Sequence, residues 1–90
     1  MDCLLITYDL NTPGQDYKDL HEVIKNLGTS WWHHLDSTWL VTTTLTPSQA
    51  WSKIAAVADK NDTFLIVNIT GDTYSGWLPE KAWTWIRNSI

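Results

Sequence analysis

The sequence predicts an α+β fold in a single domain spanning residues 1–90, on two observations. Two apolar stretches, at residues 2–11 and 63–70, have the composition of buried strands. Two further stretches, at residues 15–27 and from Thr46 onward, place apolar residues at helical spacing. A hydrophobic content of 43% is too high for a disordered chain, so we expect one packed core.

The first strand, at residues 2–11, is apolar on both faces, which is typical of a central strand. A turn at Asn11-Thr12-Pro13-Gly14 then leads into a helix at residues 15–27, and Gly28 lies just past its end. The apolar stripe of this helix comprises Tyr17, Leu20, Val23, Ile24 and Leu27.

A hairpin of two strands follows, at residues 31–35 and 37–45, with its tight turn at Asp36-Ser37. The second strand is β-branched and aromatic. Its alternation predicts one face made by Trp39, Val41, Thr43 and Leu45, and the opposite face by Thr38, Leu40, Thr42 and Thr44.

The clearest local signal is the start of the second helix. Thr46 is suited to the N-cap, Pro47 to the first helical position, and Gln49 to the closing position of a capping box. We expect this helix to run to about residue 58. Its predicted buried side comprises Trp51, Ile54, Ala55 and either Val57 or Ala58.

The C-terminal part begins with a strand at residues 63–70 and a turn at Gly71-Asp72. Residues 73–77 are compatible with either a short edge strand or a loop. Pro79 then starts a last helix that runs to about residue 88. The predicted inner side of that helix comprises Ala82, Trp83, Ile86 and Ile90.

This order of elements is that of a ferredoxin-like βαββαβ sandwich with an added C-terminal helix. Two right-handed crossovers place the first and third strands in the middle and both crossover helices on one face. The other face then needs cover, from Trp, Thr and His side chains, from the C-terminal helix or from a partner. A homodimer is the simplest such partner.

The charge of the chain disfavours a general nucleic-acid-binding surface. The net charge is −4, and the six basic residues are scattered along the sequence. No run approaches the roughly 18 apolar residues of a membrane span. The N-terminal apolar run of about eight residues follows an Asp, unlike a signal peptide. These features indicate a cytoplasmic protein without membrane contact.

Asp9 is the first candidate for chemistry, because the most buried strand delivers it. Asp9, with Asn11 beside it, could ligate Mg²⁺ or Mn²⁺ and position a water for phosphodiester hydrolysis. The alternative is structural: Asp9 accepts backbone hydrogen bonds in the turn or caps the helix that follows. One carboxylate is a poor Mg²⁺ site, so the catalytic interpretation needs a second Asp9 across a dimer axis.

His33, His34 and Asp36 form the densest polar cluster in the sequence. Adjacent strand residues point to opposite faces, so His33 and His34 cannot serve one site on that strand. His34 with Asp36 could bind metal or orient a general base, including for Ser37. The alternative is that one His packs in an interface while the other meets solvent. Cys3 is expected to be buried, and no zinc site is expected.

Seven Trp residues supply large apolar area in so short a chain. They could stack nucleic-acid bases, but stacking platforms normally lie in a positive groove, and this sequence offers none. Packing in the core and in a dimer interface is the alternative that we favour.

The motifs Tyr8-Asp9-Leu10, Gly28 and Ser37-Thr38-Trp39 resemble the CRISPR-associated protein 2 family. The stretches LLITYDLNTPGQDY, WWHHLDSTWLV, the Asp-Lys-Asn-Asp turn before FLIV, and the Trp-rich last helix are similar to the SinR-like stand-alone members of that family. The resemblance implies a homodimer of ferredoxin-like units and a metal-dependent nuclease that uses Asp9 from each subunit.

Two classes of function therefore remain open. The first is a non-catalytic dimeric module that binds a protein or joins a defence, toxin or phage-related assembly, which the acidic charge and the Trp content favour. The second is an Mg²⁺- or Mn²⁺-dependent nuclease, which the family resemblance favours. Fold-level likeness carries over to function poorly, so we place the first ahead.

Overall fold

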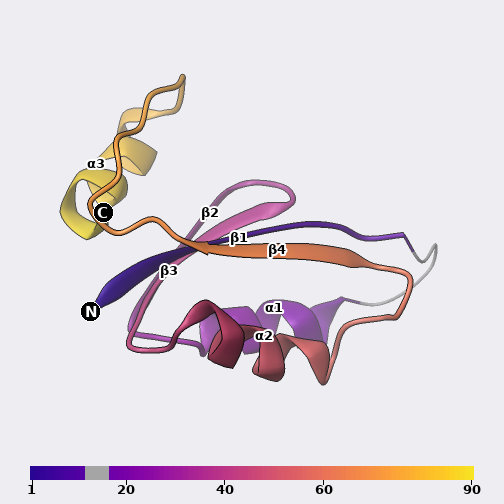
Figure 1. Cartoon of the computed structure of the whole chain (residues 1–90). Helices are drawn as coiled ribbons and strands as arrows, with labels where there is room; N and C mark the ends of the chain where they lie inside the picture. Colours follow the sequence, from indigo (N-terminus) through magenta and orange to yellow (C-terminus); the bar gives the residue numbers. More distant parts are fainter. Residues whose placement is uncertain (12–16) are drawn as a thin grey trace.

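The computed structural model describes residues 1–11 and 17–90 (Figure 1). The elements in these residues are β1 (Asp2–Asp9), α1 (Lys18–Lys25), β2 (Ser30–Leu35), β3 (Thr38–Thr43), α2 (Pro47–Ala55), β4 (Thr63–Asn68) and α3 (Glu80–Ser89). They form a small α+β fold with an open antiparallel sheet, which is compatible with a ferredoxin-like type. The predicted turn at Thr12-Pro13-Gly14 and the predicted first helical residues at 15–16 lie outside the described residues.

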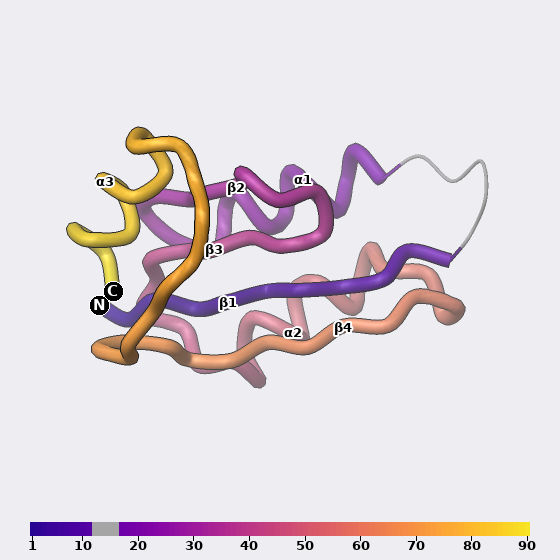
Figure 2. Tube along the Cα trace, turned by 90° about the horizontal axis from the view of Figure 1, so that it is seen from above, coloured from indigo at the N-terminus to yellow at the C-terminus, as the bar shows by residue number. Residues whose placement is uncertain are grey.

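The sheet has the strand order β2-β3-β1-β4, and every neighbouring pair is antiparallel. Strand β1 is paired on both sides: Ile6 lies opposite Trp39 of β3 and opposite Ile66 of β4. Helices α1 and α2 cover one face of the sheet (Figure 1). Helix α3 lies near the N-terminal end of β1, reached by a segment that leaves the end of β4 (Figure 2). In this strand order, β2 and β4 are the two edge strands of the sheet.

The side chains of β1 alternate between two separate cores. Leu4, Ile6 and Tyr8 are buried on the side of α1 and α2. The other buried residues of this core are Leu20, Ile24, Leu27, Trp39, Val41, Ala50 and Ile54. Cys3 is buried on the other side, with Trp32, Leu40, Ala82 and Ile86. Each large aliphatic side chain removed from water stabilises the fold by about 1.5–3 kcal/mol. The prediction that this strand is apolar on both faces is confirmed.

Helix α1 and strand β3 bury the residues that their periodicities predicted. Leu20 and Ile24 of α1 are buried, and Leu27 follows in the same core. In β3, Trp39, Val41 and Thr43 face the helices, while Leu40 belongs to the opposite core. The buried Thr43 hydroxyl donates to the carbonyl of Leu27 at 2.7 Å, which fixes the end of α1 against the sheet.

The N-terminus of α2 forms as predicted, but its buried face differs. The Thr46 hydroxyl accepts from the Gln49 N–H at 3.2 Å, and the Gln49 side chain accepts from the Thr46 N–H at 2.9 Å. The buried residues are Ala50 and Ile54, whereas Trp51 is 43% exposed and Ala55 is exposed. The prediction that Trp51 and Ala55 are buried is wrong, because the helix lies close to the sheet through the small Ala50.

Several predicted boundaries are too long by a few residues, as is common at element ends. Strand β1 ends at Asp9 and not at residue 11, and β4 ends at Asn68 and not at residue 70. Helix α2 ends at Ala55 and not at residue 58, although the N–H groups of Val57 and Ala58 still bond to the Ile54 carbonyl.

The C-terminal helix packs on the face of the sheet opposite α1 and α2. Ala82 and Ile86 are buried there, and Trp32 donates its indole N–H to the Ala82 carbonyl at 3.2 Å. Residues 73–77 have no regular secondary structure, so the loop alternative holds for them. Helix α3 covers only part of this face, because β1 and β4 continue beyond it (Figure 2).

Gly28 is required by the close approach of two backbones. A Cβ at this position would lie 1.8 Å from the Thr42 carbonyl oxygen, and the N–H of Thr29 donates to that same oxygen at 2.9 Å. The connection from α1 to β2 therefore passes against β3 with no room for a side chain.

We expect Gly28→Ala to destabilise the protein by about 3 kcal/mol or more, because backbone must move to admit the methyl group. The measurement is urea unfolding followed by tryptophan fluorescence. Gly71→Ala is the matched control, since Gly71 has φ of 75° with open space around it and costs only about 1–2 kcal/mol of backbone strain. Equal losses for the two variants would contradict the close approach.

Candidate functional site

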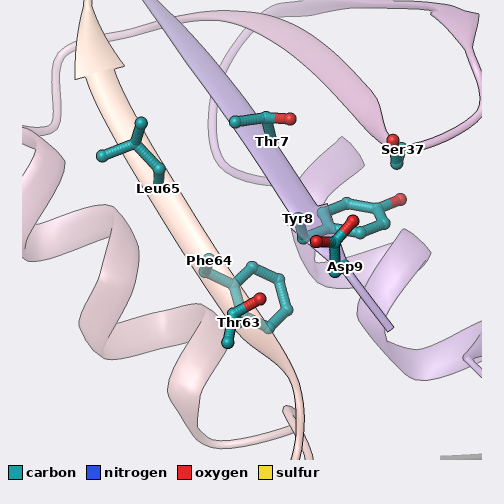
Figure 3. Close-up of a pocket in the computed structure, with 7 residues that line it drawn as sticks. All are labelled: Thr7, Tyr8, Asp9, Ser37, Thr63, Phe64 and Leu65. Atoms are coloured by element: carbon teal, nitrogen blue, oxygen red, sulfur yellow. The ribbon is translucent and has the colours of Figure 1, made fainter. Parts of the chain in front are cut away.

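Asp9 lies at the rim of an open hollow (Figure 3). The hollow is at the C-terminal end of β1, and α3 lies near the other end (Figure 2). The hollow has a volume of about 250 Å³ and is lined by Thr7, Tyr8, Asp9, Ser37, Thr63, Phe64 and Leu65. Pockets for drug-sized ligands occupy about 300–1,000 Å³ and enclose most of the ligand. This hollow is thus too small and too open to hold a small-molecule substrate by shape.

Among residues 1–11 and 17–90, the lining of the hollow includes one carboxylate and no cation. Asp9 is exposed, and its register partner on β4 is Thr63. Thr7 and Thr38 add hydroxyl groups on the same sheet, with their Oγ1 atoms 3.2 Å apart. The lining can therefore offer oxygen ligands to a hard cation, but only half of the carboxylate pair that such a site needs.

Asn11 is fixed in the structure by contacts with the turn that precedes β4. Its backbone N–H donates to Asp62 Oδ1 at 2.8 Å, and its side-chain amide donates to the carbonyl of Asn61 at 3.0 Å. The same amide lies 3.5 Å from the backbone carbonyl of Asp9, not from its carboxylate. These contacts give Asn11 a structural role that joins the end of β1 to the turn.

Asp62 is the centre of that junction, a role beyond the predicted Asp-Lys-Asn-Asp turn. Besides Asn11, it accepts from the Tyr17 hydroxyl at 3.0 Å and, through Oδ2, from the N–H of Asp59 at 3.2 Å. The spacing of Asp59 and Asp62 is the available signal, since Asp side chains bond to nearby backbone in turns.

His33 is packed against the core and not poised in a site. Its ring stacks on Trp39 with centroids 3.7 Å apart, and its Nε2 lies 3.1 Å from the backbone oxygen of Asp36. The Trp39 indole in turn donates to the Tyr8 hydroxyl at 2.8 Å. Burial raises the pKa of that hydroxyl, with the Asp36 charge adding to the effect and the Trp39 bond opposing it.

His34 lies on the opposite face of β2 and is exposed. Its ring is 5.1 Å from that of Trp32, and the Asp36 contact belongs to His33. Strand β3 separates β2 from β1, which places His34 about 10 Å across the sheet from the β1 backbone. The hollow beside Asp9 is lined by neither His33 nor His34, so Asp9 and Ser37 lie together there without either histidine.

Cys3 and some of the Trp residues pack in the core, as expected, whereas other Trp residues are exposed. Cys3 is fully buried, and burial raises the pKa of its thiol to about 11, so it stays protonated and inert. Trp32 and Trp39 are buried, but Trp77 is 98% exposed.

Large apolar side chains are exposed along β4 and the segment that follows it. On β4, Leu65 is 59% and Val67 is 37% exposed, and Tyr74 and Trp77 follow in the loop before α3. The sequence does not single out Leu65 and Val67, because an apolar run such as FLIV has the same pattern in an inner strand and in an edge strand.

Comparison with protein-family models, with curated proteins and with solved structures finds no match to the chain. Within residues 1–11 and 17–90, none of the helices has both the length and the apolar character needed to cross a membrane. The same residues contain no group of three His, Cys, Asp or Glu side chains placed to hold a metal ion.

We expect Asp62→Ala to lower the free energy of unfolding by about 1–3 kcal/mol, since it leaves three donors without their carboxylate. Chemical unfolding monitored by circular dichroism gives the value. Asp72→Ala is the control, because it removes an exposed turn carboxylate and changes stability by less than about 0.5 kcal/mol. If the two variants are equally stable, the junction does not depend on Asp62.

Proposed function

We propose that the chain is a small non-catalytic module of ferredoxin-like fold that works as a homodimer and binds protein. The order βαββαβ, with β3 and β1 as inner strands and α1 and α2 on one face, supports the ferredoxin-like assignment. The proposal of an interaction module follows from the surface of β4 and the segment after it.

The observation that carries the proposal is the exposure of Leu65, Val67 and Trp77, at 59%, 37% and 98%. Exposed apolar side chains that cluster on a small domain mark sites of protein association, and Leu65 and Val67 lie on the same face of β4. Trp is the residue that most often anchors such interfaces, because it contributes large rigid area. Leu65 and Val67 lie on the edge strand β4, and Trp77 lies on a separate loop. The chain therefore has room for a dimer interface and for a second surface that binds a protein partner.

The charge distribution supports a protein partner over a nucleic acid. The chain carries ten acidic and six basic residues. Among the basic residues, Lys25 pairs with Glu22 and Arg87 pairs with Glu80. Binding to a phosphate backbone draws its affinity from clustered Lys and Arg that displace counterions. The described residues that line the Asp9 hollow include neither Lys nor Arg. A role in a defence, toxin or phage-related assembly rests on the family resemblance alone.

We expect the protein to have twice the mass of one chain by size-exclusion chromatography with light scattering. The double variant Leu65→Lys/Val67→Lys should have the mass of one chain, because charge on an exposed strand blocks association. The matched control is Leu35→Lys, which changes a leucine of similar exposure, 49%, on β2. A wild-type chain that is monomeric at every concentration would contradict the dimer.

The second candidate is a metal-dependent nuclease, favoured by the exposed Asp9 at the rim of an open hollow. A divalent cation held there would supply Lewis-acid activation of water for phosphodiester hydrolysis. The ligands from this chain would be the Asp9 carboxylate and the Thr63 hydroxyl. The donor set fits only as half of a site, so this candidate needs two Asp9 carboxylates within a few ångströms across a dimer axis.

We expect purified protein to leave single- and double-stranded RNA and DNA uncleaved in the presence of Mg²⁺ or Mn²⁺. The readout is gel analysis at high protein concentration, with EDTA and the variant Asp9→Ala in parallel. Cleavage that is lost with EDTA and in Asp9→Ala, but retained in the exposed-carboxylate control Asp72→Ala, would establish the nuclease instead.

A further inference from the structure

The hydrogen-bond pattern of the sheet identifies which backbone groups of β4 point outward. The N–H of Ile69 donates to the Cys3 carbonyl at 2.9 Å, and residues 3 and 69 continue the register of β1 with β4. In an antiparallel pair, bonded and non-bonded residue pairs alternate. The backbones of residues 63, 65, 67 and 69 therefore bond to β1. The Tyr8 N–H, which bonds to Ser37 on the other side, agrees with this phase.

The backbones of Phe64, Ile66 and Asn68 consequently face away from the sheet. By the same alternation, the N–H groups of these three residues are not bonded to β1. Natural sheets protect such edges with Pro, Lys, inward charges or bulges. The sequence of β4, TFLIVN, has no charge and no Pro, and its pairing to β1 is regular over the whole strand. This edge is competent to pair with another strand.

The opposite edge of the sheet, β2, lacks that competence. Its register with β3 shifts between Trp32 and Leu35, which distorts the edge. Helix α3 also packs on β2, where the Trp32 indole bonds to Ala82. The two edges of the sheet therefore differ in their pairing, whose register shifts at β2 and is regular at β4.

A second hollow borders the free edge of β4. It has a volume of about 220 Å³ and is lined by Pro47, Trp51, Phe64, Leu65 and Ile66. The Trp51 ring is 43% exposed and lies 5.4 Å from the Phe64 ring. The cation of this helix, Lys53, lines a different hollow beside α1. The surface along the β4 edge is thus apolar and uncharged on the helix side as well.

We propose that β4 is the dimer interface and that it pairs antiparallel with β4 of a second copy, with Ile66 opposite Ile66. The two four-stranded sheets then form one continuous sheet of eight strands. The Trp51 hollow of each copy closes against the other along the same edge. This inference rests on the proposed homodimer and names the surface that forms it.

A second copy of the chain suits this edge, because a two-fold axis at Ile66 pairs each outward-facing residue of β4 with an outward-facing residue of the other copy. With Ile66 opposite Ile66, Phe64 lies opposite Asn68 of the second copy, so all three outward-facing residues of each copy are bonded. Leu65 lies opposite Val67 on the open face, which pairs two exposed aliphatic side chains. Strand β4 carries no charged residue, so association brings no like-charge repulsion within the strand pair.

The register is tested by disulfide trapping between two single-cysteine variants. In non-bonded antiparallel pairs the Cα atoms are about 4.5 Å apart, which suits a disulfide. We expect an equimolar mixture of Leu65→Cys and Val67→Cys chains to give a cross-linked dimer on mild oxidation. Either variant alone should not, since equivalent positions lie beyond the roughly 7 Å that a disulfide spans. Wild type controls for Cys3, which is buried.

A proline substitution tests the edge independently of any side chain. Ile66→Pro removes an N–H that points outward and leaves the bonds to β1 intact. The matched control is Ile66→Ala, which also loses the side chain but keeps the N–H. We expect the dimer dissociation constant of Ile66→Pro to exceed that of Ile66→Ala by about tenfold or more, measured by analytical ultracentrifugation, with both variants folded by circular dichroism.

The outcomes separate this inference from the proposed function. A wild-type chain that dimerises, with no cross-link in the mixture and equal dimerisation of Ile66→Pro and Ile66→Ala, overturns the β4 interface and keeps the dimer. A wild-type chain that is a monomer at all concentrations overturns both. Cross-linking of the mixture alone, with selective loss of the dimer in Ile66→Pro, supports the inference.

Discussion

The backbone of β1 is paired along both edges, with β3 on one side and with β4 on the other. Its side chains enter cores on both faces of the sheet. Leu4 and Ile6 are covered by α1 and α2, and Cys3 lies in the core completed by α3. A slip of one residue would exchange the two faces and direct charge toward a core. The positions of the other elements therefore depend on the register of this one strand.

That dependence explains how much of the fold the sequence predicts. The alternation of β3 and the capping box at Thr46 depend on local residues, and both appear as expected. The buried face of α2 does not depend on local residues alone, because the apolar residues of this helix fit two helical stripes that differ by one position. The choice is made by distance to the sheet: the small Ala50 allows close approach, and the large Trp51 lies at the rim against Phe64.

The candidate site was predictable only in part, for a related reason. The place of Asp9 follows from β1, since a central strand ends in solvent at its C-terminal residue. The role of Asn11 depends on contacts with Asn61 and Asp62, fifty residues away in the chain, which no local pattern encodes. The division of His33 and His34 between two faces was expected, but which of them meets Asp36 depends on the irregular pairing of β2 with β3.

The β4 interface bears directly on the choice between the two functions. Asp9 lies opposite Thr63, which in the proposed register lies six residues along the strand from Thr63 of the second copy. At about 3.4 Å per residue this is about 20 Å, and three strand spacings add about 14 Å across the sheet. The two Asp9 carboxylates are then about 25 Å apart, far beyond a shared cation. A dimer that continues the sheet through β4 thus favours a binding module, whereas a nuclease requires the two copies to meet beside Asp9.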